Sequence, residues 1–149
     1  MRAVIQRVKS ARVDVAAQTI GQIGHGLLVF LGVEMGDGEK DLEYICTKLI
    51  GLRIFEDDEG KMNLALGDVD GSALVVSQFT LLGDARHGRR PSFSNAAAPE
   101  EGERWYLAAV DFLRRAGIEV QTGQFRADME VHLVNDGPVT ILLDSRRAF

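Results

Sequence analysis

The feature that most limits how this chain can fold is a continuous apolar run at residues 27–33, Leu-Leu-Val-Phe-Leu-Gly-Val. A run of this length offers no polar face to water, so we interpret it as a strand covered on both faces rather than as a short helix. A second apolar run, at 73–76, lies between Gly71-Ser72 and Gly83-Asp84 and is also typical of a buried strand. Both strands require packing partners from the rest of the chain.

The flanking segments have the patterns of two helices and several further strands. In the segment 39–51, apolar residues recur at helical spacing opposite a charged face, which predicts an amphipathic helix that ends near Gly51. Pro99 suits the first turn of a second helix, which ends near Gly117. Further strands are predicted at 1–15, 19–23, 53–55, 118–121 and 129–143, the last of them interrupted at Gly137-Pro138.

This order of elements predicts an α+β fold. We expect one domain over residues 1–149, with a mostly antiparallel or mixed β-sheet that curls in a barrel-like manner and carries two main helices. A chain of this length can remove about 70% of its unfolded surface from water. The strands lack the regular alternation with helices that a doubly wound fold requires, and the chain has no glycine-rich phosphate or dinucleotide loop.

Charge and composition narrow the class of protein. A net charge of -5 argues against broad, non-specific coating of nucleic acid. The chain has neither a signal-peptide pattern nor an apolar stretch that could span a membrane, so we expect a cytoplasmic location. The single cysteine, Cys46, sits in an apolar helical pattern and is interpreted as a core residue. The residues alone leave open whether two basic groups are solvated or contact phosphate: Arg86, His87, Arg89 and Arg90, and Arg146 and Arg147.

Polar groups follow the second apolar run abruptly, in the pentapeptide Ser77-Gln78-Phe79-Thr80-Leu81. Two hydroxyls, an amide and the N–H groups of a strand end arrive together where water is scarce and unpaired donors are costly. Such a place can bind a carbonyl oxygen or an oxyanion. The alternative is a strand that runs into a loop, with the hydroxyls satisfying nearby backbone groups.

Together with three other stretches, this pentapeptide resembles the D-aminoacyl-tRNA deacylases. The stretches are Met-Arg-Ala-Val-Ile-Gln-Arg-Val at 1–8, Arg-Arg-Pro-Ser-Phe at 89–93, and Asn-Asp-Gly-Pro-Val-Thr at 135–140. The resemblance covers nearly the whole chain, in the same order and at the expected spacing. It implies a tRNA-binding ester hydrolase that proofreads chirality by removing D-amino acids from tRNA. We expect no cofactor and no metal, because no two histidines have ligand spacing.

The resemblance also implies how the enzyme distinguishes chirality. The Gly137-Pro138 bond is cis in this family, and its carbonyl oxygens enter the active site of the partner subunit of a homodimer. There they form a wall that excludes an L side chain, and glycyl-tRNA should also be accepted because glycine has no side chain to exclude. The resemblance assigns Arg7 to propping this segment, Met129 to lining the site and Phe93 to its entrance. The ordinary alternatives are that Arg7 is a surface charge on a strand, that Met129 is an apolar strand residue and that Phe93 packs into the core.

The expected catalytic group is Ser77, Gln78, Phe79 and Thr80. Backbone N–H groups at Phe79 and Thr80 are the candidates for stabilising negative charge on the ester carbonyl, with Ser77 and Gln78 positioning the adenosine and the ester. We favour attack by water, helped by the 2′-hydroxyl of the substrate, over attack by Thr80. No histidine or carboxylate near Thr80 in the sequence is an obvious activating base.

Two other functions are consistent with the sequence. The first is a module that docks onto a synthetase and binds or edits an aminoacyl end without hydrolysing it. The second is a serine hydrolase of small esters, in which Ser77 works with His25, His87 or His132. The sequence around Ser77 lacks the flanking glycines of a nucleophile elbow, which counts against the second function.

Overall fold

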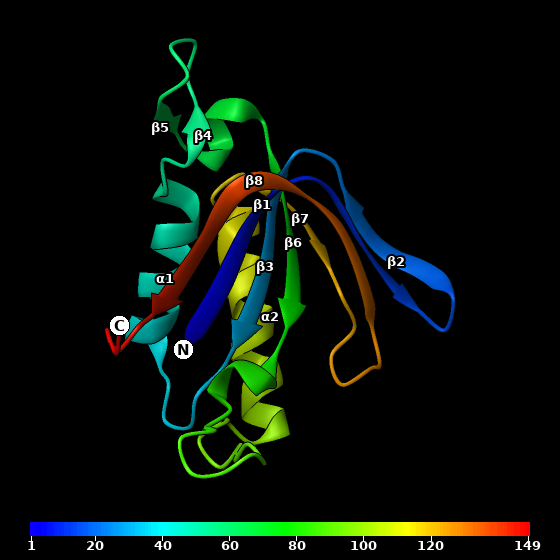
Figure 1. Cartoon of the computed structure of the whole chain (residues 1–149), viewed down its shortest axis with the longest axis vertical. Helices are drawn as coiled ribbons and strands as arrows, with labels where there is room; N and C mark the ends of the chain where they lie inside the picture. The colour runs from blue at the N-terminus through cyan, green and yellow to red at the C-terminus, as the bar shows by residue number, and fades with distance from the viewer.

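The two apolar runs form neighbouring strands at the centre of a six-stranded sheet (Figure 1). The computed structural model describes residues 1–149. β3 (Gly26–Gly32) and β6 (Ser72–Ser77) pair in parallel, and β7 (Glu119–Thr122) pairs in parallel with β6. β1 (Arg2–Val15) lies antiparallel to β3 on the other side. Both central strands are therefore confirmed, and the sheet is mixed.

β1 is long enough to serve three partners, and this bends the sheet. Its first half pairs with β3, and its second half pairs with β2 (Gln18–Ile23) across a turn at Ala16 and Ala17. Both alanines have a positive φ, 49° and 62°, which is uncommon for a residue other than glycine. β8 (Glu130–Asp144) runs along the opposite edge of β1 over nearly its whole length. The strands predicted at 1–15 and 19–23 are confirmed, and they pair as an antiparallel hairpin.

The sheet curls because β2 comes back to the end of β7. A Cβ added to Gly21 would lie 2.4 Å from the carbonyl oxygen of Thr122, so only glycine permits this approach. Inside the curl is a cluster of seven buried residues: Val8, Ala11, Val13, Ile23, Leu28, Leu74 and Val76. The curled, barrel-like form expected from the element order is confirmed.

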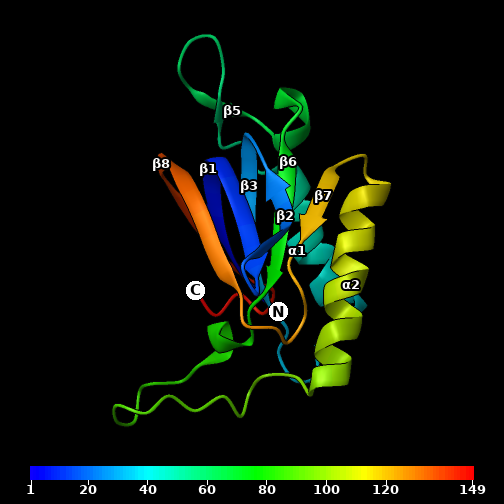
Figure 2. The same ribbon diagram turned by 90° about the vertical axis from the view of Figure 1, so that its right-hand side faces the viewer.

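Two helices cover one face of the sheet (Figure 2). They are α1 (Glu39–Gly51) and α2 (Pro99–Arg115), at the predicted positions. Between them and the sheet lies the main core of 23 buried residues, which includes Leu27, Val29 and Leu31 of β3. Because Leu28 faces the curl instead, β3 is covered on both faces as expected.

Cys46 of α1 and Tyr106 of α2 both belong to the main core. Cys46 is fully buried, and burial raises the pKa of its thiol to about 12, which confirms it as a core residue. The hydroxyl of Tyr106 donates to the carbonyl oxygen of Val75 at 2.9 Å and so ties α2 to β6. No helix in this fold combines the length and the apolar character needed to span a membrane.

The strand predicted at 53–55 is misplaced. β4 covers only Phe55–Glu56 and pairs with a short strand that was not predicted, β5 (Met62–Leu64). The carbonyl oxygen of Ile54 instead accepts a hydrogen bond from Arg7 Nη1 at 2.6 Å, so Ile54 does not join the ladder.

The last predicted strand contains a bulge rather than a break. β8 continues through Gly137 and Pro138, and residues 136–139 stand opposite Arg7 alone. The remaining elements are two short 3-10 helices that were not predicted, η1 (Leu66–Val69) and η2 (Phe79–Leu82).

Candidate active site

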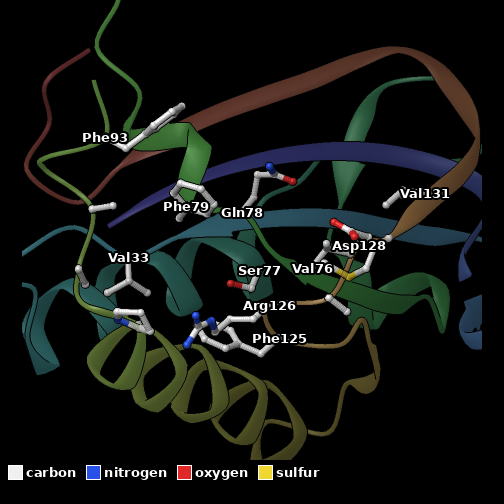
Figure 3. A pocket seen from close by; sticks show the side chains of 16 residues that line it. Val33, Val76, Ser77, Gln78, Phe79, Phe93, Phe125, Arg126, Asp128 and Val131 are labelled. Carbon is white, nitrogen blue, oxygen red and sulfur yellow. The ribbon is translucent and has the colours of Figure 1, made fainter. Parts of the chain in front are cut away.

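A pocket of about 640 Å³ opens where β3 and β6 end (Figure 3). Ten of its sixteen lining residues are hydrophobic, and its volume is typical of a ligand site. Val33 and Val76 form the wall at the strand ends, and Pro99 and Gly102 contribute the first turn of α2. Further walls come from the turn after β6, from the loop before α2, and from the loop between β7 and β8 with the start of β8.

The chain turns sharply at the pocket immediately after β6. The N–H of Gln78 still donates to Leu31 of β3 at 2.8 Å, and the turn η2 begins at the next residue. A Cβ on Gly32 would lie 2.6 Å from Leu82 Cδ2 and 2.8 Å from the carbonyl oxygen of Gln78. Glycine at the end of β3 therefore allows η2 to pack closely against the sheet.

This turn brings together most of the polar pentapeptide. Ser77, Gln78 and Phe79 line the pocket, whereas Thr80 does not. The hydroxyl of Thr80 accepts a hydrogen bond from Gln78 Nε2, which links the two side chains. Phe79 and Thr80 carry the first N–H groups of η2, and a helical turn cannot satisfy its own first N–H groups. The corner is therefore a short helical turn with available donors, and not the loop that was the alternative.

An exposed aromatic pair stands at the pocket entrance. Phe79 is 57% exposed, and its ring meets that of Phe93 edge to face, with 5.3 Å between the ring centroids. Phe93 comes from the long irregular segment 83–98 and also lines the pocket. It is thus a wall residue of the pocket and not a core residue.

The loop between β7 and β8 supplies pocket residues that the sequence analysis missed. Met129 was expected there, but Phe125, Arg126 and Asp128 were not. Figure 3 shows Phe125, Arg126 and Asp128 among the side chains that line the pocket. No ion pair includes Arg126 or Asp128. Their position between two predicted strands signalled a loop, and nothing local indicated that this loop would close a pocket.

Gly137 and Pro138 do not line this pocket. Their peptide bond is cis, and the residue before them is held by Arg7. Arg7 is only 5% exposed, and its Nε lies 3.1 Å from the carbonyl oxygen of Asp136 and 3.2 Å from that residue's carboxylate. Arg7 is therefore a buried tie between β1 and the bulge of β8, not a surface charge.

The three histidines lie outside the pocket. His25 packs edge to face against Phe55, with 5.1 Å between centroids, and His132 Nε2 lies 3.2 Å from the carboxylate of Asp14. His87 is exposed in the segment 83–98. No Ser-His-Asp arrangement forms around Ser77.

The two basic groups have different surroundings. Arg86 donates to the carboxylate of Asp84 at 2.9 Å, and this hydrogen bond is the main reason that the pKa of Asp84 lies well below its usual range. Arg146 pairs with Glu34 and Asp37 at 3.3 and 3.2 Å. The other arginines of the two groups are exposed and take part in no ion pair: Arg89, Arg90 and Arg147. Cζ of Arg147 lies 5.9 Å from the centroid of the Tyr44 ring.

Known proteins match this chain over almost its full length. A family model described as D-Tyr-tRNA(Tyr) deacylase matches residues 4–144. A relative from Thermotoga petrophila named D-aminoacyl-tRNA deacylase is 58% identical over 149 residues, all of both chains. Another of that name from Geobacter sulfurreducens is 60% identical over 98% of this chain and 96% of its own.

Solved structures share the fold. One titled c-Myc DNA Unwinding Element Binding Protein is 40% identical and has a TM-score of 0.91, covering 97% of this chain and 98% of that one. A second, titled Structural Analysis of a probable eukaryotic D-amino acid tRNA deacylase, has a TM-score of 0.80 over 95% of this chain and 97% of that one. At 18% identity, its likeness concerns the fold alone.

Proposed function

The chain belongs to the D-Tyr-tRNA(Tyr) deacylase family, and from this we propose that it hydrolyses the ester between a D-amino acid and the terminal ribose of tRNA. The products are the free D-amino acid and tRNA. The observation that carries the proposal is the corner at Ser77, Gln78 and Phe79, where polar groups and the first N–H groups of η2 meet in an otherwise apolar pocket.

Hydrolysis of the ester builds negative charge on its carbonyl oxygen. The N–H groups of Phe79 and Thr80 stabilise this charge, and a single donor of this kind is worth roughly 3 to 4 kcal/mol in other enzymes. Ser77 and Gln78 hold the ester and the terminal ribose. The hydrogen bond from Gln78 to the Thr80 hydroxyl supports this assignment because it fixes the orientation of the Gln78 amide.

A water molecule is the attacking group, with the 2′-hydroxyl of the substrate assisting. One observation disfavours Thr80 as the nucleophile, because its hydroxyl is engaged by Gln78. The mechanism assigns no role to a metal or a cofactor, and hydrolysis in the presence of a chelator tests the role of a metal directly.

Chirality is selected by Gly137 and Pro138 of a second copy of the chain. Neither residue lines the pocket of its own chain, which supports a wall that a partner supplies. At roughly 3.3 Å per strand residue, the stretch from Val131 in the pocket to Gly137 is about 20 Å long. Arg7 positions the wall through its contacts with Asp136. Such a wall excludes an L side chain and accepts glycine, so glycyl-tRNA is a further substrate.

An uncovered face of the sheet supports the homodimer. Leu142, Val4 and Phe30 are register partners on three adjacent strands and form an exposed to half-buried apolar row on the face away from the helices, and their neighbour on β6, Val76, is fully buried. Leu142 is 56% exposed in the single chain, and the row leads to the pocket at Val76. Contiguous apolar surface of this kind is typical of a protein interface.

The first test compares matched D-tyrosyl-tRNA and L-tyrosyl-tRNA, each incubated with the purified protein and a chelator. We expect rapid release of D-tyrosine, with the L ester decaying only at the spontaneous rate measured without protein. Glycyl-tRNA should be cleaved as well. If neither tyrosyl ester is cleaved faster than without protein, the binding-module function replaces this proposal. Cleavage that stops only with the chelator would contradict the metal-free mechanism.

A further inference from the structure

Two charged side chains in the pocket, Arg126 and Asp128, have no part in the proposed mechanism. We propose that Arg126 binds the phosphate on the 5′ side of the substrate's terminal adenosine. Arg126 is then a phosphate-binding residue that makes the enzyme prefer an ester on a nucleotide to the same ester on a nucleoside. This inference rests on the proposed function.

The backbone holds Arg126 in an unusual conformation at the pocket rim. Its φ is 62°, in the left-handed region that few residues other than glycine adopt. The N–H of Ala127 donates to the carbonyl oxygen of Gln124 at 3.3 Å and closes the turn that contains Arg126. Such conformations persist where the surrounding structure fixes them, and they cluster at ligand sites.

Arg126 is the only cationic side chain among the sixteen residues that line the pocket. Some other arginines of this chain have carboxylate partners, such as Arg86 with Asp84 and Arg146 with Glu34. Arg126 has none within 4.0 Å. Its guanidinium therefore remains available to an anionic ligand.

The chemistry of the substrate offers one anion at this end. The terminal aminoacyl nucleotide carries an adenine, a ribose, the ester, a cationic α-ammonium group and a single phosphate group. Arginine binds phosphate through two parallel N–H···O bonds, whereas it repels the ammonium group. The apolar lining suits the nucleoside, and the exposed position of Arg126 suits a phosphate that stays in contact with water.

The test uses two small esters that differ only in this phosphate: 3′-O-D-tyrosyl-adenosine and 3′-O-D-tyrosyl-adenosine 5′-monophosphate. For the native protein, kcat/KM should be higher on the monophosphate. Arg126→Ala should lower kcat/KM about tenfold on the monophosphate and on D-tyrosyl-tRNA, the loss expected for one charged hydrogen-bonded contact. On the nucleoside ester it should change kcat/KM less than twofold. Most of the loss should be in KM, and Arg126→Lys should recover part of it as a point charge.

A matched control removes the same charge elsewhere. Arg115 is exposed in the last turn of α2, at the opposite end of the helix from the pocket, and Arg115→Ala should leave all three substrates unaffected. An equal loss on both small esters would overturn the proposal, because Arg126 would then act on the nucleoside or on the fold. No loss on either would overturn it too. If the native protein cleaves none of the three esters, the proposed function itself fails, a result that the Arg126 variants cannot mimic.

Discussion

Arg7 shows how much one residue can hold in place. Its buried guanidinium contacts the backbone of Ile54 and both the backbone and the side chain of Asp136, so a single side chain of β1 joins two segments that are remote in sequence. A second carboxylate, that of Glu56, lies 3.9 Å from Nη2. The charge is buried, but it is well compensated.

We predict that Arg7→Met lowers the free energy of unfolding by about 2 to 4 kcal/mol, because it leaves the carbonyl oxygens of Ile54 and Asp136 without donors. Under the proposed function, it also lowers the ratio of D to L cleavage, since the wall loses its support. Denaturant unfolding and the two tyrosyl-tRNA rates measure these effects. Arg7→Lys should be intermediate, because lysine lacks the planar fork.

The control for this prediction is Arg53→Ala. Arg53 is exposed and donates to the carbonyl oxygen of Asn63 at 2.8 Å, so its loss should change the free energy of unfolding by less than about 0.5 kcal/mol. An Arg7→Met protein as stable and as selective as the native one would contradict the role given to Arg7.

The sequence indicated some site residues and not others, for physical reasons. The polar group after β6 was visible because an apolar run ends abruptly at Ser77, which is a local signal. Arg126 and Asp128 were not visible, because only the return of the β7–β8 loop toward α2 brings them into the pocket. The burial of Arg7 likewise depends on partners far away along the chain.

Among the elements, the end of β8 is held by a buried carboxylate. Asp144 accepts hydrogen bonds from Arg2 Nε and from the N–H of Arg146, both at 2.8 Å. Burial raises the pKa of this carboxyl, but these hydrogen bonds lower it by more, so its pKa lies below the usual value. A depressed pKa means that the ionised form stabilises the fold.

We predict that Asp144→Asn lowers the free energy of unfolding by about 2 kcal/mol at pH 7. Because the folded pKa is below the unfolded value of about 3.9, this contribution is complete above pH 5 and is lost as the pH falls through the folded pKa. The native protein and the variant should therefore converge in stability below about pH 4. Unfolding curves at pH 7, 5, 4 and 3 measure the difference.

The exposed carboxylate of Asp58 gives a matched control. It takes part in no ion pair, and Asp58→Asn should follow the native protein at every pH. A constant gap between the native protein and Asp144→Asn down to pH 3 would show that the ionised form of Asp144 is not what stabilises β8.

Elements with a strong local pattern were predictable, and those made by distant contacts were not. α1 and α2 match their predicted spans because the apolar spacing and the proline and glycine signals are local. η2 depends on close packing of Leu82 against Gly32, and β4 is displaced by the contact between Arg7 and Ile54. Neither contact can be read from its own segment.

At the scale of the whole molecule, one chain is half of the proposed site. We predict a mass of about twice 16.3 kDa by light scattering at micromolar concentration. Leu142→Asp places a charge in the apolar row and should give a folded monomer. Its activity on D-tyrosyl-tRNA should fall at least about tenfold, because the wall is then absent from each pocket and charge burial opposes association.

Leu107→Asp makes the same change on α2, where Leu107 is 51% exposed, and should remain a fully active dimer. A native protein that is monomeric and active, or a Leu142→Asp monomer with full activity and selectivity, would contradict the shared site.

The order of the strands and helices along the chain was enough to predict the class of fold. Strands, helix, strands, helix and strands predicted a mixed α+β sheet, and this is confirmed. It could not show that β8 would follow β1 over nearly its whole length, because strand pairing between the two ends of a chain is set by the complete fold. The separation of Gly137 from its own pocket follows from that pairing alone.

In the proposed dimer, the length of β8 sets the distance between two catalytic centres. Its first residues, including Val131, line the pocket of one subunit, while Gly137 and Pro138 form the wall in the pocket of the other. Inserting a single residue between Val131 and Gly137 would turn every later side chain of β8 to the opposite face of the sheet. Gly137 and Pro138 would then no longer meet the partner's pocket in the correct position. The number of residues between these points is therefore a functional quantity, whatever side chains they carry.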